Sequence, residues 1–287
     1  MIYTNKYGLC SELYEAIVNR QKRYDKGEAD FSATELIDPP RIVQLTRRHY
    51  DEIEVDITSL LESWKGHLVH DALERPQTSN RLYCKIGASV ICGAYDYYLD
   101  GVLKDYKTVS VWGTIVGNPQ KKWREQLGVY QYLLQYHRLP VDKMVIEAIF
   151  KDWSETDLKR QGHSYPAKPV MSYSLAPYES QEVFDLIHSR VGIHERAMMM
   201  MDNELPECTL DEMWAKPTTF AVVKEGQTRA QRVFADIEEA ESFAKGRSDF
   251  SMLSIDVRMG ERTRCEKYCD VKPFCSQYKE YSNARIK

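Results

Sequence analysis

Apolar residues recur at helical spacing in five stretches, which predicts five helices. These cover residues 9–26, ending at Gly27, then 57–74, about 120–137, about 178–202 and about 236–246. Alternation at a period of two predicts strands over 81–99 and 102–108, joined by Asp100-Gly101, a dipeptide that favours two-residue hairpin loops. Val145 to Phe150 predicts another strand, and 170–174 a further one within an otherwise irregular stretch, 151–177. The order helix, hairpin, helix, strand predicts an α/β (α+β mixed) fold with a central mixed sheet flanked by helices.

Changes in this pattern divide the chain into three predicted segments. These are a helical amino-terminal segment, 1–56, the main α/β segment, 57–205, and a smaller module of short strands, 206–287. The fourth predicted helix ends in the run Met198 to Met201. Such a run can form an adhesive surface, but core filling at helical spacing is the interpretation we favour.

Composition excludes several classes of protein. The 287 residues are 43% hydrophobic and 29% charged, and no apolar run reaches the roughly 18–20 residues that cross a bilayer. The first residues lack the basic and apolar regions of a secretory signal. A net charge of -4 argues against coating nucleic acid by bulk charge, but leaves a local binding groove open. We expect a soluble, cytoplasmic protein with no membrane partner.

The predicted hairpin gathers charged residues on one face. Its register places Asp96 directly opposite Asp105, and strand alternation returns Lys107 to the same face. Two opposed carboxylates destabilise a hairpin unless something compensates, and Mg²⁺ and Mn²⁺ favour carboxylate oxygens. A solvated polar face with an incidental Asp–Lys pair explains the pattern about equally well, so the geometry suggests a metal site without deciding it.

Neighbouring motifs give this hairpin a family resemblance. Asp96, Asp105 and Lys107 resemble the D…(D/E)xK core of the PD-(D/E)XK nuclease superfamily. Gly66 to His70 resembles the GxxxH motif of its RecB-like exonuclease branch, and Gln126 to Tyr130 resembles the QxxxY motif. The resemblance runs from about 64 to 135. Asp105 stands where many relatives have Glu, which shortens the side chain by one methylene and keeps the charge.

The resemblance implies a role for each motif residue. Lys107 would orient or help deprotonate the attacking water, and Gln126 and Tyr130 would steady the lysine or a DNA phosphate. His67, one turn before His70 on the same helix face, is the alternative histidine, and Glu74 is a further candidate through a bridging water. The implied ligands of a Mg²⁺ or Mn²⁺ ion are His70, Asp96, Asp105 and the backbone carbonyl of Tyr106.

Basic and aromatic residues follow the hairpin. Lys121, Lys122 and Arg124, with Trp112 and Trp123 nearby, are candidates for holding phosphates and stacking on unpaired bases. A solvated helix start and core tryptophans are the alternative for each residue.

The seven cysteines are too few for a disulfide scaffold, and three of them, Cys265, Cys269 and Cys275, cluster near the carboxyl end. Clustered thiols in a reducing compartment indicate a metal or cluster site, and their spacing alone does not separate Zn²⁺ from an iron–sulfur cluster. Cys208 is the expected fourth ligand, and Cys10 is the alternative. Cys84 and Cys92 lie in predicted strands and are expected to be buried.

Resemblance to the iron–sulfur group of these nucleases, which includes CRISPR adaptation nucleases, implies a structural 4Fe–4S cluster, with structural Zn²⁺ as the alternative. The function implied is that of a metal-dependent DNA nuclease, an exonuclease on single strands or duplex ends in recombination, replication or repair in a bacterium or phage. DNA is the expected partner, and a recombination or replication protein a further one. A CRISPR-adaptation nuclease that processes spacers and a non-catalytic DNA-binding scaffold are the alternatives, and the complete motif set argues against the scaffold.

Overall fold

The computed structural model describes residues 1–22, 26–73, 81–117 and 119–286. The chain divides into two compact units, Met1–Met201 and Asp202–Lys287. Their boundary lies close to the one expected at 205/206, and the expected amino-terminal segment, 1–56, is part of the first unit. The division into three segments stays a prediction. Among the described helices, none is both long enough and apolar enough to cross a membrane.

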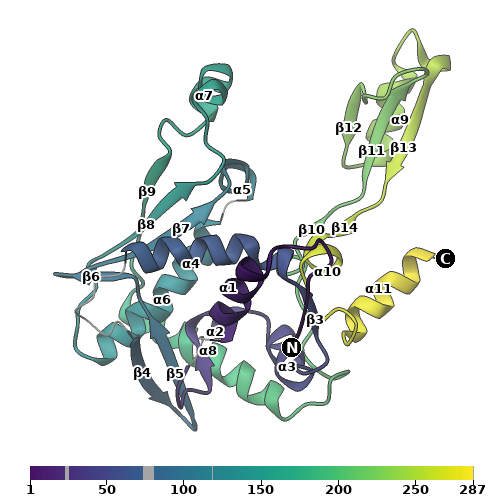
Figure 1. The fold of residues 1–287 in the computed structure, drawn as a ribbon. Coiled ribbons are helices and arrows are strands. Elements are labelled where there is room, and N and C mark those ends of the chain that lie inside the picture. Colours follow the sequence, from purple (N-terminus) through teal and green to yellow (C-terminus); the bar gives the residue numbers. More distant parts are fainter. Residues whose placement is uncertain (23–25, 74–80, 118, 287) are drawn as a thin grey trace. The chain divides into compact units, whose positions relative to one another are not determined.

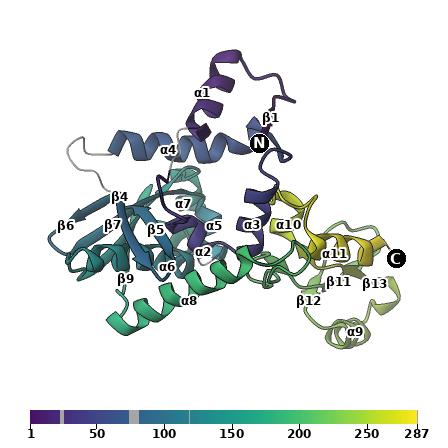
Figure 2. The same ribbon diagram turned by 90° about the horizontal axis from the view of Figure 1, so that it is seen from below.

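The first unit is a mixed α/β structure, which confirms the expected fold class. Figure 2 shows its larger sheets between α4 and α8. In chain order the elements are β1 (Ile2–Thr4), α1 (Ser11–Lys22), β2 (Phe31–Ser32), α2 (Ala33–Ile37), α3 (Pro40–Arg48), β3 (Glu54–Asp56), α4 (Leu61–Leu73), β4 (Arg81–Ile86), β5 (Ser89–Ala94), β6 (Tyr97–Leu99), β7 (Val102–Val109), α5 (Val111–Gly117), α6 (Gln120–Tyr136), β8 (Lys143–Phe150), α7 (Glu155–Gln161), β9 (Val170–Leu175) and α8 (Ser180–Met198).

The largest sheet has the strand order β6-β7-β8-β9. β7 and β8 run parallel, whereas β6 and β9 pair antiparallel with their neighbours. A parallel pair needs a long crossover connection, and α5 and α6 supply it between β7 and β8 (Figure 1). A second sheet has the order β2-β5-β4, and β1 pairs in parallel with β3.

Helix α6 packs against the sheets because its apolar positions recur every three or four residues. Trp123, Leu127, Tyr130 and Leu134 fall on one stripe and are buried in the main core. Ile146 and Ala148 of β8 belong to the same core and are fully buried. Each buried leucine side chain contributes about 2 kcal/mol of hydrophobic stabilisation, so α6 is held firmly over the strands that carry the charged residues.

The Asp100-Gly101 hairpin forms as predicted. Both residues have positive φ, 46° and 78°, the combination required by a two-residue type I′ turn. Leu99 pairs with Val102, and the expected register continues to the pair of Tyr97 with Lys104. The single strand predicted over 81–99 is wrong, because the chain turns back after Ile86 and forms the antiparallel pair β4–β5 before β6 begins.

The five predicted helices are present with shifted ends. The first four correspond to α1, to a 3₁₀ turn at Ile57–Leu60 followed by α4, to α6 and to α8; parts of the first two predicted ranges lie outside the described residues. The prediction of irregular chain over 151–177 missed α7, although Ser154 carries a helix-start signal: its Oγ accepts from the amide of Asp157 at 3.0 Å.

The methionine run is exposed, so the core-filling interpretation is wrong. The buried stripe of α8 ends at Ala197, whose carbonyl accepts from Arg48 at 3.1 Å. Met199 is 88% exposed and Met201 68% exposed. Because the helix ends at Met198, the methionines that follow lie beyond it and do not extend its buried face.

His194 of α8 is fully buried and uncharged in the fold. Its ring lies 5.1 Å from the Phe31 ring, and its Nε2 lies 3.2 Å from the carbonyl oxygen of Leu36. Burial lowers the pKa of His194 from 6.5 to about 4, and the positive charge of Arg190 adds to the shift. Between these two values the unfolded chain takes up a proton that the folded chain does not, so stability falls as the pH falls.

We expect this histidine to cost about 3 kcal/mol of unfolding free energy as the pH falls from about 6.5 to about 4. His194→Gln keeps a hydrogen-bond donor but cannot titrate, so urea unfolding of this variant should depend less on pH over that interval. His163→Gln, at an exposed histidine, is the control and should keep the wild-type dependence. Equal pH dependence in wild type and His194→Gln would contradict this prediction.

The second unit consists of β10 (Ala215–Lys216), β11 (Thr219–Lys224), β12 (Arg232–Phe234), α9 (Ile237–Lys245), β13 (Leu253–Arg258), β14 (Glu261–Arg262), α10 (Thr263–Lys267) and α11 (Ser276–Ile286). β11 pairs with both β12 and β13, and α9 lies against this sheet (Figure 1). α9 confirms the helix predicted over 236–246; Asp236 caps it by accepting from the amides of Glu238 and Glu239.

Candidate functional site

The charged cluster is centred on β7 and the bend before β6. Asp105 and Lys107 are two residues apart on β7 and therefore share a face of the sheet. The expected pairing of Asp96 directly opposite Asp105 is wrong, because the β6–β7 ladder ends at Tyr97 and Asp96 lies in a bend before it. The carboxylate of Asp96 instead accepts from the amide of Tyr106 at 2.7 Å, which fixes it beside Asp105.

Helix α4 brings His70 to this cluster. His70 Nδ1 lies 2.9 Å from Asp96 Oδ1, and this hydrogen bond raises the pKa of His70. A side chain at Gly66 would place its Cβ 3.1 Å from Thr108 Oγ1, so glycine allows the close approach of α4 to β7. His67 is half-buried. Burial lowers the pKa of His67, and the positive charge of Arg20 lowers it further. Asp96 is hydrogen-bonded to His70 rather than to His67, and the further candidate Glu74 lies outside the described residues.

A chain of polar contacts holds Lys107. Its Nζ lies 2.7 Å from Asp105 Oδ2 and donates to Gln126 Oε1 at 2.8 Å. Gln126 Nε2 in turn donates to the hydroxyl oxygen of Tyr130 at 3.0 Å, and Tyr130 is buried in the core. Gln126 and Tyr130 are four residues apart and therefore lie on one face of α6. Tyr130 holds the amide of Gln126, which in turn positions Lys107.

Asp105 is an acid in an environment that disfavours its charge. Only 3% of it is exposed; burial raises its pKa, the nearby Asp96 raises it further, and Lys107 opposes the shift. Its Oδ2 contacts Lys107 at ion-pair distance, but the angles do not make a hydrogen bond, so this oxygen has no hydrogen-bond partner among the described residues. A buried carboxylate oxygen in this state favours an additional cation.

The donor set fits a hard divalent cation, since one imidazole and two carboxylates are ligand types that Mn²⁺ and Mg²⁺ accept. Within the described part of the chain, no three His, Cys, Asp or Glu side chains converge closely enough to hold a metal ion as they stand. At this cluster Asp96 is hydrogen-bonded to His70, and Asp105 is paired with Lys107. A cation would replace these contacts.

The basic residues at the start of α6 differ in their surroundings. Lys121 is exposed, and Lys122 pairs with Asp38 at 3.4 Å. The Arg124 guanidinium lies 3.7 Å from the centre of the Tyr178 ring and donates to the carbonyl of Ala176 at 2.9 Å. Arg124 therefore ties α6 to the chain before α8, and its predicted DNA contact stays a prediction.

The two tryptophans also differ. Trp112 on α5 is 52% exposed, whereas Trp123 is 6% exposed and its ring packs 5.7 Å from that of Tyr173 on β9. Of the two, only Trp112 has a surface open to a ligand.

Four cysteines gather in the second unit because β10 pairs with β14. Ala215 pairs with Arg262, and the amide of Arg264 donates to the carbonyl of Met213 at 3.0 Å. This brings the segment that contains Cys208 beside the segment that contains Cys265. The sequence between the two strands folds separately as β11, β12, α9 and β13.

The four thiols influence one another electrostatically. Burial raises the pKa of Cys208 to about 12, with contributions from Cys275 and Cys265, and raises that of Cys269 to about 11, with contributions from the same two thiols. Four thiolates are the donor set of Zn²⁺ or an iron–sulfur cluster, but among the described residues these four thiols do not converge closely enough to hold either as they stand. Cys10 is exposed and belongs to the first unit.

Gln277 is a residue that sequence reasoning missed. Its Oε1 accepts from the amide of Cys208 and its Nε2 donates to the carbonyl of Cys208, both at 2.9 Å. The two residues are 69 positions apart, and a lone glutamine in a polar helix gives no signal of such a contact. Cys84 and Cys92 are buried in β4 and β5, as expected.

Comparisons with known proteins find distant structural likenesses. No protein-family model and no curated protein sequence matches the chain. A protein designated SSO0001 is similar over 66% of this chain and 88% of its own, with 15% identity and a TM-score of 0.44. A phage-related exonuclease from Haemophilus somnus 129PT is similar over 66% of this chain and 79% of its own, with 15% identity and a TM-score of 0.30. These TM-scores are too low to support an assignment of function, which depends on the chain's own residues.

Proposed function

We propose that the chain is a metal-dependent DNA nuclease, specifically an exonuclease, with a RecB-like PD-(D/E)XK core. The observation that carries the proposal is the meeting of three motifs that are separate in sequence. His70 contacts Asp96, and Lys107 contacts both Asp105 and Gln126. Incidental polar residues on three different elements have no reason to form one connected network.

The proposed roles follow from the contacts. His70, Asp96, Asp105 and the carbonyl of Tyr106 would hold Mg²⁺ or Mn²⁺, which supplies polarisation of the phosphate and a water of lowered pKa. Lys107 orients that water and offsets the negative charge that develops on the phosphate. Gln126 and Tyr130 are positioning residues, because they act through the lysine ammonium.

The remaining parts of the proposal concern substrate and stability. Lys121, Lys122 and the exposed ring of Trp112 are the proposed contacts to the phosphates and bases of DNA. We further propose that Cys208, Cys265, Cys269 and Cys275 hold a structural 4Fe–4S cluster, with Zn²⁺ as the alternative. A role in recombination, replication or repair follows from exonuclease action on single strands or duplex ends.

The proposal is tested with DNA labelled separately at its 5′ and 3′ ends, in single- and double-stranded form. We expect degradation by anaerobically purified protein with Mg²⁺ or Mn²⁺, and none with a chelator. Asp105→Asn should abolish the activity, whereas Asp185→Asn, at an exposed position on α8, should not. Folded, cluster-loaded protein that cleaves no DNA, or equal cleavage by Asp105→Asn, would refute the nuclease assignment.

A further inference from the structure

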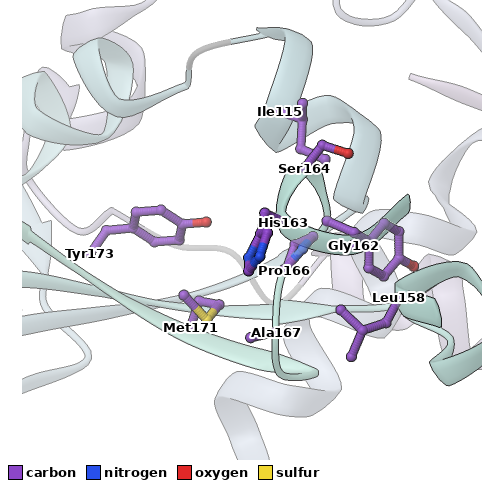
Figure 3. A pocket seen from close by; sticks show the side chains of 10 residues that line it. Ile115, Leu158, Gly162, His163, Ser164, Pro166, Ala167, Met171 and Tyr173 are labelled. Carbon is purple, nitrogen blue, oxygen red and sulfur yellow. The ribbon is translucent and has the colours of Figure 1, made fainter. Parts of the chain in front are cut away.

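A pocket that no sequence motif indicates lies beside β9. Its volume is about 540 Å³, within the range of roughly 300–1,000 Å³ that small-molecule sites occupy. Ile115 of α5, Leu158 of α7 and Met171 of β9 give it apolar sides, while Tyr173, His163 and Ser164 add two rings and a hydroxyl. Figure 3 shows the hydroxyl end of Tyr173 pointing toward His163 across the pocket.

The register of the sheet connects this pocket to the candidate active site. Asp105 pairs with Ile146, which pairs with Tyr173; Lys107 likewise pairs with Ala148, which pairs with Met171. Side chains in one row across a sheet point to the same face. Tyr173 and Met171 therefore lie on the face that carries Asp105 and Lys107, two strands away, which is about 10 Å at the usual strand spacing of about 4.8 Å.

Helix α6 spans the same two places. Gln126 holds Lys107 over β7, and Trp123, one turn earlier, packs on Tyr173 over β9. The opposite wall is also fixed: Trp153 Nε1 donates to the carbonyl of Pro166 at 2.8 Å, and the hydroxyl of Tyr165 accepts from the amide of Ser154 at 3.1 Å. Hydrogen bonds and ring packing thus hold the walls of the pocket in place, and one helix and one sheet extend from it to the candidate active site.

We propose that this pocket binds an unpaired nucleobase of the strand being cleaved. This inference rests on the proposed nuclease function and specifies its substrate. Ile146 and Ala148 between the two places are fully buried, so the strand must pass around the core, and at about 3.4 Å per nucleotide the base lies at least about three nucleotides from the scissile phosphate. The pocket therefore makes cleavage favour single strands or frayed ends, because a paired base cannot enter it.

The chemistry of the lining favours a base over a purely apolar group. A nucleobase presents two flat faces to stack on the rings of Tyr173 and His163, and polar edges to reach the hydroxyl of Ser164. The sides supplied by Ile115 and Met171 accept the rest of the ring surface. An apolar side chain from another protein would use neither the imidazole of His163 nor the hydroxyl oxygen of Ser164.

The test combines an abasic scan with pocket variants. Binding of a labelled single-stranded oligonucleotide by the full chain is measured under chelation, with one base removed at each position in turn. Removing the base that enters the pocket should weaken wild-type binding about tenfold, in line with the cost of losing one base–aromatic stack. In Tyr173→Ala and His163→Ala the same removal should change binding less than about twofold, since the stack is already lost.

Matched variants separate stacking from folding. Tyr173→Phe keeps the ring and should keep the wild-type response, and Tyr136→Ala removes an exposed aromatic residue at the far end of α6 without changing it. His163 is itself exposed, so its replacement does not threaten the core. The inference would be overturned if removing a base weakened wild-type binding equally at every position. It would also be overturned, in favour of another occupant, if the pocket variants weakened binding of intact and abasic strands equally. Metal-dependent cleavage without any abasic effect would overturn the pocket assignment alone, whereas no DNA binding and no cleavage would overturn both proposals.

Discussion

Replacing Lys107 by alanine is expected to lower the rate of DNA cleavage by about 10³-fold while the fold persists. The ammonium group is the only cation that contacts both Asp105 and Gln126 in the described network. Its loss removes charge stabilisation of the phosphate and orientation of the water, each of which is worth roughly 10²-fold or more. Rates measured under single-turnover conditions with Mn²⁺ and saturating protein would report this loss directly.

Lys104→Ala is the matched control for this prediction. Lys104 lies on the same strand but on the opposite face, where it pairs with Glu147 at 3.2 Å. It should leave the cleavage rate within about twofold, because its side chain lies on the face of the sheet away from Asp105 and Lys107. Residual activity of Lys107→Ala near the wild-type level, or an equal loss in both variants, would count against the proposed active site. Iron content should be unchanged in both, since Lys107 belongs to the other unit from the cysteines.

The second large effect is expected for the cysteine cluster. Cys269→Ser should remove the iron and the visible absorbance, and residues 202–287 should unfold at a much lower temperature. A bound metal group contributes about 10 kcal/mol of folding free energy in small metal-dependent domains, and among the described residues of this unit the apolar core around Val222 and Phe234 is small. Iron analysis, absorbance and thermal unfolding measure the three consequences.

Cys10→Ser is the control, because Cys10 is exposed and lies in the first unit. It should retain the iron, while Cys208→Ser should lose it. The reverse result would show that Cys10 rather than Cys208 is the fourth ligand. Wild-type protein that contains Zn²⁺ and lacks colour would replace the iron–sulfur assignment by a structural zinc site.

The local geometry around the candidate site was predicted well where its signals are local. The Asp100-Gly101 turn sets the register of β6 and β7, because both residues adopt the left-handed conformation that this hairpin loop needs. The spacing of four from Gln126 to Tyr130 places both on one face of a helix. The position of Asp96 was missed because the register could not show that the ladder stops at Tyr97.

The pocket and the cysteine unit show where local signals end. Nothing in the residues around Tyr173 indicates that β9 joins the sheet of β7 two strands away, since strand order depends on packing between distant segments. The strand pair β10–β14 is only two residues long in each strand, too short to be read as an alternating pattern. The contact of Gln277 with Cys208 depends on that pairing.

The sequence by itself determined the longer helices, the hairpin turn, the motif residues and the three clustered cysteines, because each depends on spacing within one helix, one turn or one short segment. Only the tertiary structure decided that Asp96 accepts a hydrogen bond from the amide of Tyr106 and that Gln126 accepts one from Lys107. It also decided that a pocket lies on the same face of the sheet as Asp105. These contacts join residues from separate elements, and the burial of one shared core fixes which elements meet.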